Sequence, residues 1–464
     1  MNALLDPKGV VFEAEAAVLI VGAGAAGLCA ALAAHEVGAN VVVVERDKVP
    51  RGSTALSAGL IPAAGTRFQR ERGIVDDAAA FARDIQHKAG GAADPAIVVT
   101  AARESGPTVE WLADRHGLAF SVVHDFDYPG HSGRRMHGLA SRSGAELIGA
   151  LTRAVEAAAI PILTEATVTN LYADVAGRVR GIEVTRPDGA VERIGCRALV
   201  LACSGYGGNA ELVRRHIPEM ADAIYFGHPG NRGDALLWGE QLGAEARFMA
   251  SYQGHGSVAH PHGILITWAA ITEGGFQVDS QGHRFSDESQ GYSEQAAVVL
   301  REAQGIAFHI FDDRIAVIAR QFADYRQAEA VGAVISANTI AELAARTKLP
   351  PATLARTFAE VDSLKADSTV DGFGRSFAGV APLAPPYKAV RVTGALFHTQ
   401  GGLGIDAEAR VLRPDGRPLP NLFAAGGAAA GVSGNTAAGY LSGNGLLTAT
   451  VFGRIAGVRA AAAL

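Results

Sequence analysis

The glycine-rich segment near the N-terminus constrains the fold of this chain more than any other feature. An apolar run ends at Gly22, and Gly24 and Gly27 complete a Gly-x-Gly-x-x-Gly pattern before an Ala-rich stretch. A second apolar run then ends at Glu45. This order predicts a βαβ unit, in which the glycines allow a tight turn, the approach of a pyrophosphate to a helix N-terminus, and close packing of helix on strand. An acid about 20 residues after the glycines is placed to accept ribose hydroxyls, so the segment predicts a dinucleotide cofactor.

Composition narrows the class of protein. With 464 residues, of which 48% are hydrophobic and 19% charged, the chain is expected to form two domains with a sizeable core. The formal net charge is −6 and no basic run occurs, which argues against nucleic acid and anionic membranes as partners. No apolar run reaches the length of a membrane span. Three cysteines are too few for a disulfide framework, and residues 1–17 lack a secretion signal, so we expect a cytoplasmic protein.

Helical and strand patterns alternate along the chain. The expected elements are helical segments at 76–116, 147–155, 336–346 and 351–365, a strand at 168–171, a hairpin formed by 181–185 and 190–194, a buried strand at 197–202, and a last helix ending near Val458. The strand at 197–202 runs into a second glycine-rich turn, at a strand end where doubly wound folds bind ligands. The segment from about Tyr252 to Val390 differs from the rest of the chain, with several histidines, short strands and helices, and is interpreted as an inserted cap.

Further motifs follow the glycine pattern in order along nearly the whole chain. They are Ser53–Gly59, Gly130–Arg135, Leu201–Asn209, Asn231–Asp234, Gly282–Glu288 and Leu422–Gly426. With these motifs the chain resembles the flavoprotein subunits of the fumarate reductase and succinate dehydrogenase superfamily, together with aspartate oxidases and 3-ketosteroid dehydrogenases. The resemblance implies an α/β fold with a Rossmann-like FAD-binding domain and an inserted α+β capping (substrate) domain. The implied boundaries are 1–251 and 393–464 for the FAD-binding domain and 252–392 for the cap.

The resemblance also implies which residues hold FAD. These are Gly22, Gly24, Ala26, Gly27, Glu45, Arg46, Ser53, Thr54, Ser57, Gly59, Val168, Ser204, Gly205, Asn209, Asp234, Gly426, Gly427, Ser442 and Leu446. Relatives that tether the flavin do so through a histidine in the small-residue loop, and residues 51–59 contain none, so noncovalent FAD is expected. Gly427 departs from the family, in which a glutamate often holds the ribityl chain, so backbone between Tyr440 and Leu446 is the expected substitute.

At the positions where the resemblance implies substrate contacts, this chain lacks the groups that bind a dicarboxylate. Fumarate reductases hold their substrate with paired arginines, because a guanidinium meets a carboxylate through two charge-assisted hydrogen bonds. Matching the motifs places Ile271 and Tyr440 at the two arginine positions, and Phe397, followed by His398, at a substrate histidine. An apolar pocket with a phenol suits a neutral hydrophobic substrate better than a dianion.

These replacements resemble the 3-ketosteroid dehydrogenase branch. In that branch one tyrosine takes a substrate proton, which matches Tyr292, and a second polarises the ketone, which matches Tyr440. A backbone N–H about four residues on, here Asn444, assists, and Ser442 completes a Tyr-x-Ser pattern. A phenol has a reference pKa of about 10 and is a poor base at neutral pH, so a relay partner is needed, for which Tyr128 is the candidate.

Three functions remain open at this stage. The leading hypothesis is an FAD-dependent oxidoreductase acting on CH–CH bonds, which desaturates a 3-ketosteroid or a smaller cyclohexanone-type ring such as 4-oxocyclohexanecarboxylate. The alternative is a flavin-dependent ene or fumarate-type reductase acting on an activated C=C bond, and the third is an FAD-binding protein without catalysis. The electron acceptor (oxygen, a quinone, a dye-like acceptor or a protein) and the oligomeric state are not specified. No metal is expected, because the spacing of His255, His260 and His262 fits no zinc signature.

Overall fold

The computed structural model describes residues 3–124 and 127–463, which divide into two compact units. The first unit consists of Met1–Pro218, Gly227–Tyr252 and His398–Leu464, and the second of Glu219–Phe226 and Gln253–Phe397. The short segment Glu219–Phe226, which the sequence places in the cofactor domain, contributes strand β11 (Ile224–Tyr225) to the sheet of the second unit. A mixed α/β fold with a parallel sheet is present, as predicted.

The first unit is built on a mixed sheet with the order β1-β8-β9-β10-β2-β3-β7, to which β21 adds beside β10 and β20 beside β21. Its strands are β1 (Ala3–Leu5), β2 (Ala14–Val21), β3 (Val41–Val44), β7 (Ile162–Leu163), β8 (Thr167–Ala173), β9 (Val179–Thr185), β10 (Val191–Leu201), β20 (Arg410–Leu412) and β21 (Pro418–Ala424). The four strands β10, β2, β3 and β7 pair in parallel, and β21 joins β10 in parallel. The carboxyl ends of β2, β10 and β21 therefore meet at one edge of the sheet.

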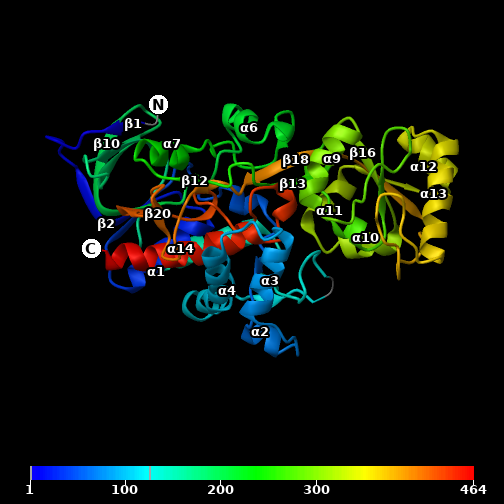
Figure 1. Ribbon diagram of the computed structural model, residues 1–464, viewed down its shortest axis with the longest axis horizontal. Helices are drawn as coiled ribbons and strands as arrows, with labels where there is room; N and C mark the ends of the chain where they lie inside the picture. The colour runs from blue at the N-terminus through cyan, green and yellow to red at the C-terminus, as the bar shows by residue number, and fades with distance from the viewer. Residues whose placement is uncertain (1–2, 125–126, 464) are drawn as a thin grey trace. The chain divides into compact units, whose positions relative to one another are not determined.

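Helices and small sheets complete the first unit. They are α1 (Ala25–Glu36), α2 (Arg67–Arg70), α3 (Ala78–Lys88), α4 (Pro95–His116), α5 (Gly144–Ala157), α6 (Ala210–His216), α7 (Asp234–Gln241) and α14 (Asn444–Ala462), with the sheets β4 (Ile61–Pro62), β6 (Met136–Gly138), β5 (Ser121–Val122) and β12 (Ala246–Arg247), β19 (Gly402–Leu403). Helices α1 and α14 lie side by side (Figure 1). A Cβ at Gly453 would lie 2.4 Å from the carbonyl oxygen of Ala26, and one at Gly457 would lie 2.2 Å from that of Ala30. The two helices pack this closely because α14 presents glycines to α1.

The second unit is a sheet with the order β14-β13-β18-β16-β15, extended by β11 and β17 alongside β18. Its strands are β13 (Tyr252–Ala259), β14 (Ile264–Leu265), β15 (Phe276–Val278), β16 (Ala307–Asp312), β17 (Val334–Ala337) and β18 (Tyr387–Thr399), and its helices are α8 (Ala269–Thr272), α9 (Tyr292–Glu302), α10 (Asp313–Ala319), α11 (Ala323–Ala330), α12 (Ile340–Thr347) and α13 (Pro351–Ala366). A separate hydrophobic core, which includes Phe276, Phe311 and Phe358, fills this unit.

Several predicted elements need correction. The hairpin is confirmed, since Thr185 of β9 pairs with Val191 of β10, but the strands predicted at 190–194 and 197–202 are one continuous strand, β10. The helical pattern at 76–116 forms two helices, α3 and α4, because Gly90 and Gly91 adopt positive φ between them. Ser336, predicted to begin a helix, lies in β17.

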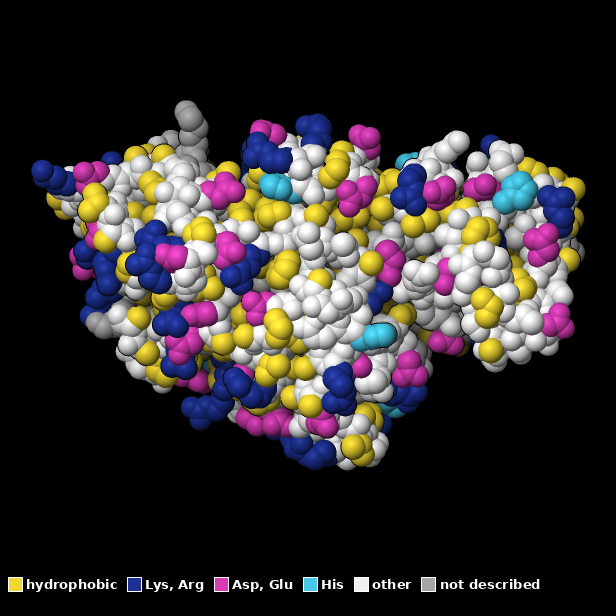
Figure 2. Space-filling view, viewed as in Figure 1, with side chains coloured by type: hydrophobic (Ala, Val, Ile, Leu, Met, Phe, Trp, Pro, Cys, Tyr) yellow, Lys and Arg dark blue, Asp and Glu magenta, His cyan; other side chains and the backbone are white. Residues whose placement is uncertain are grey.

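Charged side chains of both signs are interspersed over the face shown in Figure 2, without a large region of one charge. Within the described residues, none of the helices combines the length and the apolar character that crossing a membrane requires.

Candidate functional site

The turn between β2 and α1 has room only for glycine at two positions. Gly22 has a φ of +105°, and a Cβ there would lie 2.5 Å from the carbonyl oxygen of Ala202. A Cβ at Gly27 would lie 1.8 Å from the carbonyl oxygen of Gly22. The backbone of the turn therefore approaches both the neighbouring strand end and the first turn of α1, as the glycine pattern predicts.

The N-terminus of α1 is arranged to meet an anionic group. Its N-cap is Gly24, and no side chain caps it from that position, so the helix begins without a carboxylate or hydroxyl of its own. The backbone N–H of Ala25 donates to Oγ1 of Thr54 at 3.1 Å. Glu45 accepts from the N–H of Ala23 at 2.8 Å and from that of Asp47 at 3.0 Å. A carboxylate has about four lone-pair sites, so Glu45 retains acceptor capacity for ribose hydroxyls beside the turn.

The loop after β3 is fixed by hydrogen bonds from other parts of the first unit. Oγ of Ser53 accepts from the side-chain amide of Asn231 at 2.8 Å, and Oγ of Ser57 donates to the carbonyl of Thr54 at 2.7 Å. A Cβ at Gly59 would lie 2.4 Å from the carbonyl oxygen of Ser143, so the loop also packs tightly on the start of α5. A further predicted pair, Arg46 and Asp234, forms an ion pair at 2.7 Å.

A second tight backbone junction forms where β10 and β21 end. Ser204 adopts a φ of +67°, and a Cβ at Gly205 would lie 2.0 Å from Oγ1 of Thr399. A Cβ at Gly427 would lie 2.8 Å from the backbone nitrogen of Gly205, so no side chain fits there without movement of the backbone. Gly426, with a φ of +62°, completes the turn.

Four more of the predicted cofactor residues belong to helices, a strand and a helix cap of the first unit. The side chain of Asn209 caps α6 by accepting from Glu211 at 3.1 Å and Leu212 at 3.2 Å. Val168 is a buried residue of β8. Ala26 lies in α1 and Leu446 in α14. Contacts of these residues with a cofactor stay predictions.

Tyr440 lies four residues before the start of α14, in contact with His398. It is 6% exposed, and its ring meets the imidazole edge-to-face, with the centroids 5.6 Å apart. The N–H of Gly445 donates to Tyr440 Oη at 3.4 Å. The predicted donor amide, that of Asn444, instead donates to the carbonyl of Leu441 at 3.0 Å, because the backbone turns there into the helix. The backbone donor beside the phenol is thus Gly445, and the assistance of Asn444 to a substrate ketone stays a prediction.

His398 is held by a chain of hydrogen bonds that starts in α14. Nδ2 of Asn444 donates to Oγ of Ser433 at 3.0 Å, and that hydroxyl donates to Oε1 of Gln400 at 2.9 Å. The amide nitrogen of Gln400 lies 3.2 Å from Nδ1 of His398. Burial lowers the pKa of His398 to about 4, so the imidazole beside Tyr440 is neutral at pH 7. Oδ1 of Asn444 is buried without a hydrogen-bond partner among the described residues.

Tyr292 is the first residue of α9 and belongs to an aromatic cluster of the second unit. Its ring stacks on His255, with the centroids 4.6 Å apart and the planes at 16°. The imidazole also stacks on Phe397 at 5.3 Å, and Phe397 stacks on Phe226 at 4.7 Å. The rings of Trp268 and His255 meet edge-to-face, with the centroids 5.7 Å apart. Sequence reasoning missed Phe226 and Trp268, since no motif contains them.

Two histidines in and beside the cluster around Tyr292 are neutral at pH 7. Burial and the neighbouring His309 lower the pKa of His255 to about 3. Burial also lowers the pKa of His309 to about 3, and its Nε2 lies 2.7 Å from the side-chain amide nitrogen of Gln277. Within the described residues, Nδ1 of His255 and Nε1 of Trp268 are buried without a hydrogen-bond partner.

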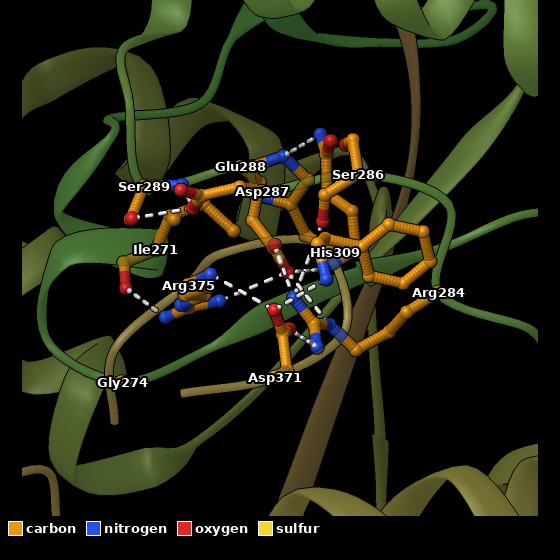
Figure 3. A network of polar contacts seen from close by, with 12 residues as sticks. Ile271, Gly274, Arg284, Ser286, Asp287, Glu288, Ser289, His309, Asp371 and Arg375 are labelled. Atoms are coloured by element: carbon orange, nitrogen blue, oxygen red, sulfur yellow. Dashed lines mark hydrogen bonds and ion pairs between the residues drawn. The ribbon is translucent and has the colours of Figure 1, made fainter. Parts of the chain in front are cut away.

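A buried ion network fixes the segment that precedes Tyr292 (Figure 3). Glu288 is 1% exposed and contacts Arg284 at 2.7 Å and Arg375 at 2.9 Å. Arg284 also pairs with Asp371. Burial opposes ionisation of Glu288, but Arg375 and Arg284 together lower its pKa. Arg375 in addition donates to the carbonyl of Ile271 at 3.2 Å, so the network joins the motif before Tyr292 to α8.

The remaining predicted substrate residues are placed as follows. Ile271 has no exposed surface and Ser442 is 4% exposed. Tyr128 is half-buried in the first unit, and its carbonyl accepts from the N–H of His131 at 3.3 Å. Tyr292 belongs to the second unit, whereas Tyr128 and Tyr440 belong to the first. Substrate contacts of these residues, and the relay from Tyr128 to Tyr292, stay predictions.

Residues 17–446 match the family described as FAD binding domain. The chain belongs to this family. It is an FAD-dependent oxidoreductase of the superfamily that includes the fumarate reductase flavoproteins, which confirms FAD as the predicted cofactor. The glycine turn, the open N-terminus of α1 and Glu45 fit that cofactor.

Two curated relatives cover almost the whole chain. A probable fumarate reductase, Ifc3 of Shewanella frigidimarina (strain NCIMB 400), is 31% identical over 96% of this chain and 74% of its own length. The 4-oxocyclohexanecarboxylate 2-dehydrogenase of Sinomonas cyclohexanicum is 26% identical over 95% of this chain and 93% of its own length. The chain is thus similar to a protein named as a reductase and to one named as a dehydrogenase.

Solved structures share the fold. The open conformation of a flavocytochrome c3 fumarate reductase superposes with a TM-score of 0.82 at 29% identity, covering 97% of this chain and 79% of the other. A 3-ketosteroid Δ4-(5α)-dehydrogenase from Rhodococcus jostii RHA1 superposes with a TM-score of 0.78 at 24% identity, covering 99% of this chain and all of the other. The second likeness concerns the fold alone.

Proposed function

We propose that this protein desaturates a small cyclic ketone by removing a proton from the α carbon and a hydride from the β carbon. The observation that carries the proposal is the buried phenol of Tyr440, hydrogen-bonded by the N–H of Gly445 and flanked by a neutral histidine, His398. A phenol donates a hydrogen bond to a ketone oxygen, but it provides no positive charge to hold a dicarboxylate.

The chemistry follows from the acidity that a carbonyl confers on its α carbon. Negative charge grows on the ketone oxygen as the α proton leaves, and the O–H of Tyr440 is the donor assigned to that oxygen. The N–H of Gly445 donates to the phenol oxygen of Tyr440, and this polarisation strengthens the phenol O–H as a hydrogen-bond donor. Tyr292 is assigned the α proton, as in the resemblance to ketosteroid dehydrogenases. FAD, when bound, supplies the hydride acceptor.

The substrate class rests on the apolar surroundings of Tyr292 and on one relative. The rings of His255, Trp268 and Phe397 form an uncharged aromatic cluster, which suits a substrate with a hydrophobic ring. Similarity over most of both chains to 4-oxocyclohexanecarboxylate 2-dehydrogenase favours a single-ring ketone over a steroid. The electron acceptor is left open.

The Tyr292→Phe variant tests the proposal. Anaerobic stopped-flow reduction of the FAD-loaded protein by 4-oxocyclohexanecarboxylate is expected to slow by about 10²- to 10⁴-fold, the usual contribution of a general base, while the FAD content stays that of wild type. Tyr387→Phe is the matched control, because Tyr387 lies in the same unit and packs on Phe358 at 5.2 Å, away from the aromatic cluster. Equal rates in wild type and Tyr292→Phe would remove Tyr292 from the mechanism.

A second function is reduction of an activated C=C bond, which the 31% identity to a probable fumarate reductase favours. The same donors and base would serve this direction. The test is to reduce the protein with dithionite under anaerobic conditions and to add 2-cyclohexenone or fumarate. Rapid reoxidation by either compound, together with no reduction by any ketone, would favour the reductase.

A further inference from the structure

His131 connects the loop after β5 to the segment that carries Tyr440. Its Nε2 lies 2.9 Å from the carbonyl oxygen of Ser442, two residues beyond the phenol. The same two segments touch at a second point, where a Cβ at Gly130 would lie 2.8 Å from Cδ1 of Leu441. The proposed function above makes no use of either contact.

The hydrogen bonds of His131 define its protonation state. A carbonyl oxygen only accepts, so Nε2 must carry the proton that it donates to Ser442. Nδ1 lies 3.3 Å from Nη1 of Arg135, and a guanidinium only donates, so Nδ1 must be unprotonated. Burial and the charge of Arg135 lower the pKa of His131 to about 4, which agrees with this neutral form.

Arg135 is itself fixed from several sides. Its side chain has no exposed surface and contacts Asp76 through Nη2 at 2.7 Å and through Nε at 2.9 Å. Nη1 pairs with Asp84 of α3. The guanidinium also lies over the ring of Phe81, 4.7 Å from its centroid. A buried guanidinium bound by two carboxylates has little freedom to move, so it holds the imidazole in one orientation.

We propose that His131 is a positioning residue that fixes the Tyr440–Ser442 segment by bridging the Ser442 carbonyl to the Asp76–Arg135–Asp84 cluster. The inference rests on the proposed role of Tyr440. The bridge acts on the backbone of that segment, and it therefore sets where the phenol oxygen lies relative to a bound ketone. A misplacement of about 1 Å in such a group costs up to about 10²-fold in rate.

Three variants at one position separate the hydrogen bond from the packing. His131→Phe keeps a ring against Phe81 but loses both hydrogen bonds. In His131→Gln, the amide nitrogen reaches about as far as Nε2 and the amide oxygen can accept from Arg135, so it is the conservative rescue. His131→Asn carries the same groups on a shorter side chain. We expect kcat/KM for 4-oxocyclohexanecarboxylate to fall by about 10-fold or more in the Phe and Asn variants, mostly through kcat, and to recover within about 3-fold in the Gln variant.

Hydrogen exchange followed by mass spectrometry provides a readout that does not depend on the substrate. Amides of residues 440–446 are expected to exchange faster in FAD-loaded His131→Phe than in wild type, and at the wild-type rate in His131→Gln. His137→Phe is the matched control, because His137 lies in the neighbouring strand β6 and is buried, whereas His131 is half-buried, and it bonds Oγ1 of Thr66 and the carbonyl of Arg135. It is expected to leave exchange at 440–446 unchanged.

The two readouts distinguish the possible failures. Wild-type exchange at 440–446 in His131→Phe, or equal acceleration in His137→Phe, would overturn the positioning role. Wild-type protein that no ketone reduces would overturn the proposed function, while the exchange data would still decide the positioning role. If His131→Phe does not fold, the Asn and Gln variants give the same comparison, and equal exchange in those two would overturn the proposal.

Discussion

Replacing Glu288 with glutamine removes one negative charge from a buried network of four charges. In the native protein Glu288 and Asp371 balance Arg284 and Arg375, with contacts of 2.7 Å and 2.9 Å from Glu288 to the two arginines. After the substitution one positive charge in the network has no counterpart, and Arg375, with a side chain 3% exposed, keeps its bond to the carbonyl of Ile271 and its contact with the ring of Phe377. Breaking a buried pair by removing one partner costs about 3–5 kcal/mol, so we expect a loss of that size in the free energy of unfolding.

The matched control is Glu360→Gln, which has the same sequence spacing to an arginine but opposite burial. Arg356 and Glu360 lie 4.0 Å apart with side chains 62% and 66% exposed, and such a pair contributes at most about 0.5 kcal/mol. Urea unfolding at pH 7 with excess FAD measures both variants. A loss below about 1 kcal/mol in Glu288→Gln, or equal losses in both variants, would refute the reasoning. The two arginines lower the pKa of Glu288. The stability that the ionised Glu288 provides is therefore present above pH ~4.3 and is lost as the pH falls through its folded-state pKa. The difference in the free energy of unfolding between wild type and Glu288→Gln should accordingly become smaller in acid.

Three further predictions concern the first unit. Tyr440→Phe should lower kcat/KM for a cyclic ketone by about 10²- to 10³-fold without loss of bound FAD, measured by steady-state kinetics and the flavin absorbance. Gly427→Ala should destabilise the FAD-loaded protein by about 1–3 kcal/mol in urea titrations, because its Cβ would lie 2.8 Å from the backbone nitrogen of Gly205. His131 and His398, with pKa values of about 4 against about 6.5 in the unfolded chain, bind fewer protons when folded. The stability they provide is therefore present above pH ~6.5 and lost as the pH falls toward 4, which the thermal midpoint measured from pH 7 to pH 5 should show as a steady decrease.

Local chemistry made the cofactor half of the fold predictable. Within one βαβ unit, Gly22 is required by its positive φ and Gly27 by the carbonyl oxygen of Gly22, so their spacing alone indicates the turn. The hairpin of β9 and β10 was likewise signalled by its Pro-Asp-Gly turn. Gly90 and Gly91, which separate α3 from α4, carry a signal of the same kind, although the helical periodicity on both sides obscured it.

Contacts between distant segments were not predictable from the sequence. Arg375 meets Glu288 across a separation of 87 residues, and His131 meets Ser442 across 311. No periodicity connects such positions, because the side chains are brought together only by the packing of complete domains. A related cause determines which backbone N–H lies beside the Tyr440 hydroxyl. It is that of Gly445 and not that of Asn444, because the position depends on where α14 begins.

The most direct test of the proposed desaturation is the visible spectrum of the FAD-loaded protein under anaerobic conditions, before and after addition of 4-oxocyclohexanecarboxylate and, separately, of succinate. The account predicts that the ketone bleaches the flavin band and that succinate does not. Bleaching by succinate alone would contradict it, because that result requires a dicarboxylate site, which the proposed donor Tyr440 and the neutral His398 do not provide.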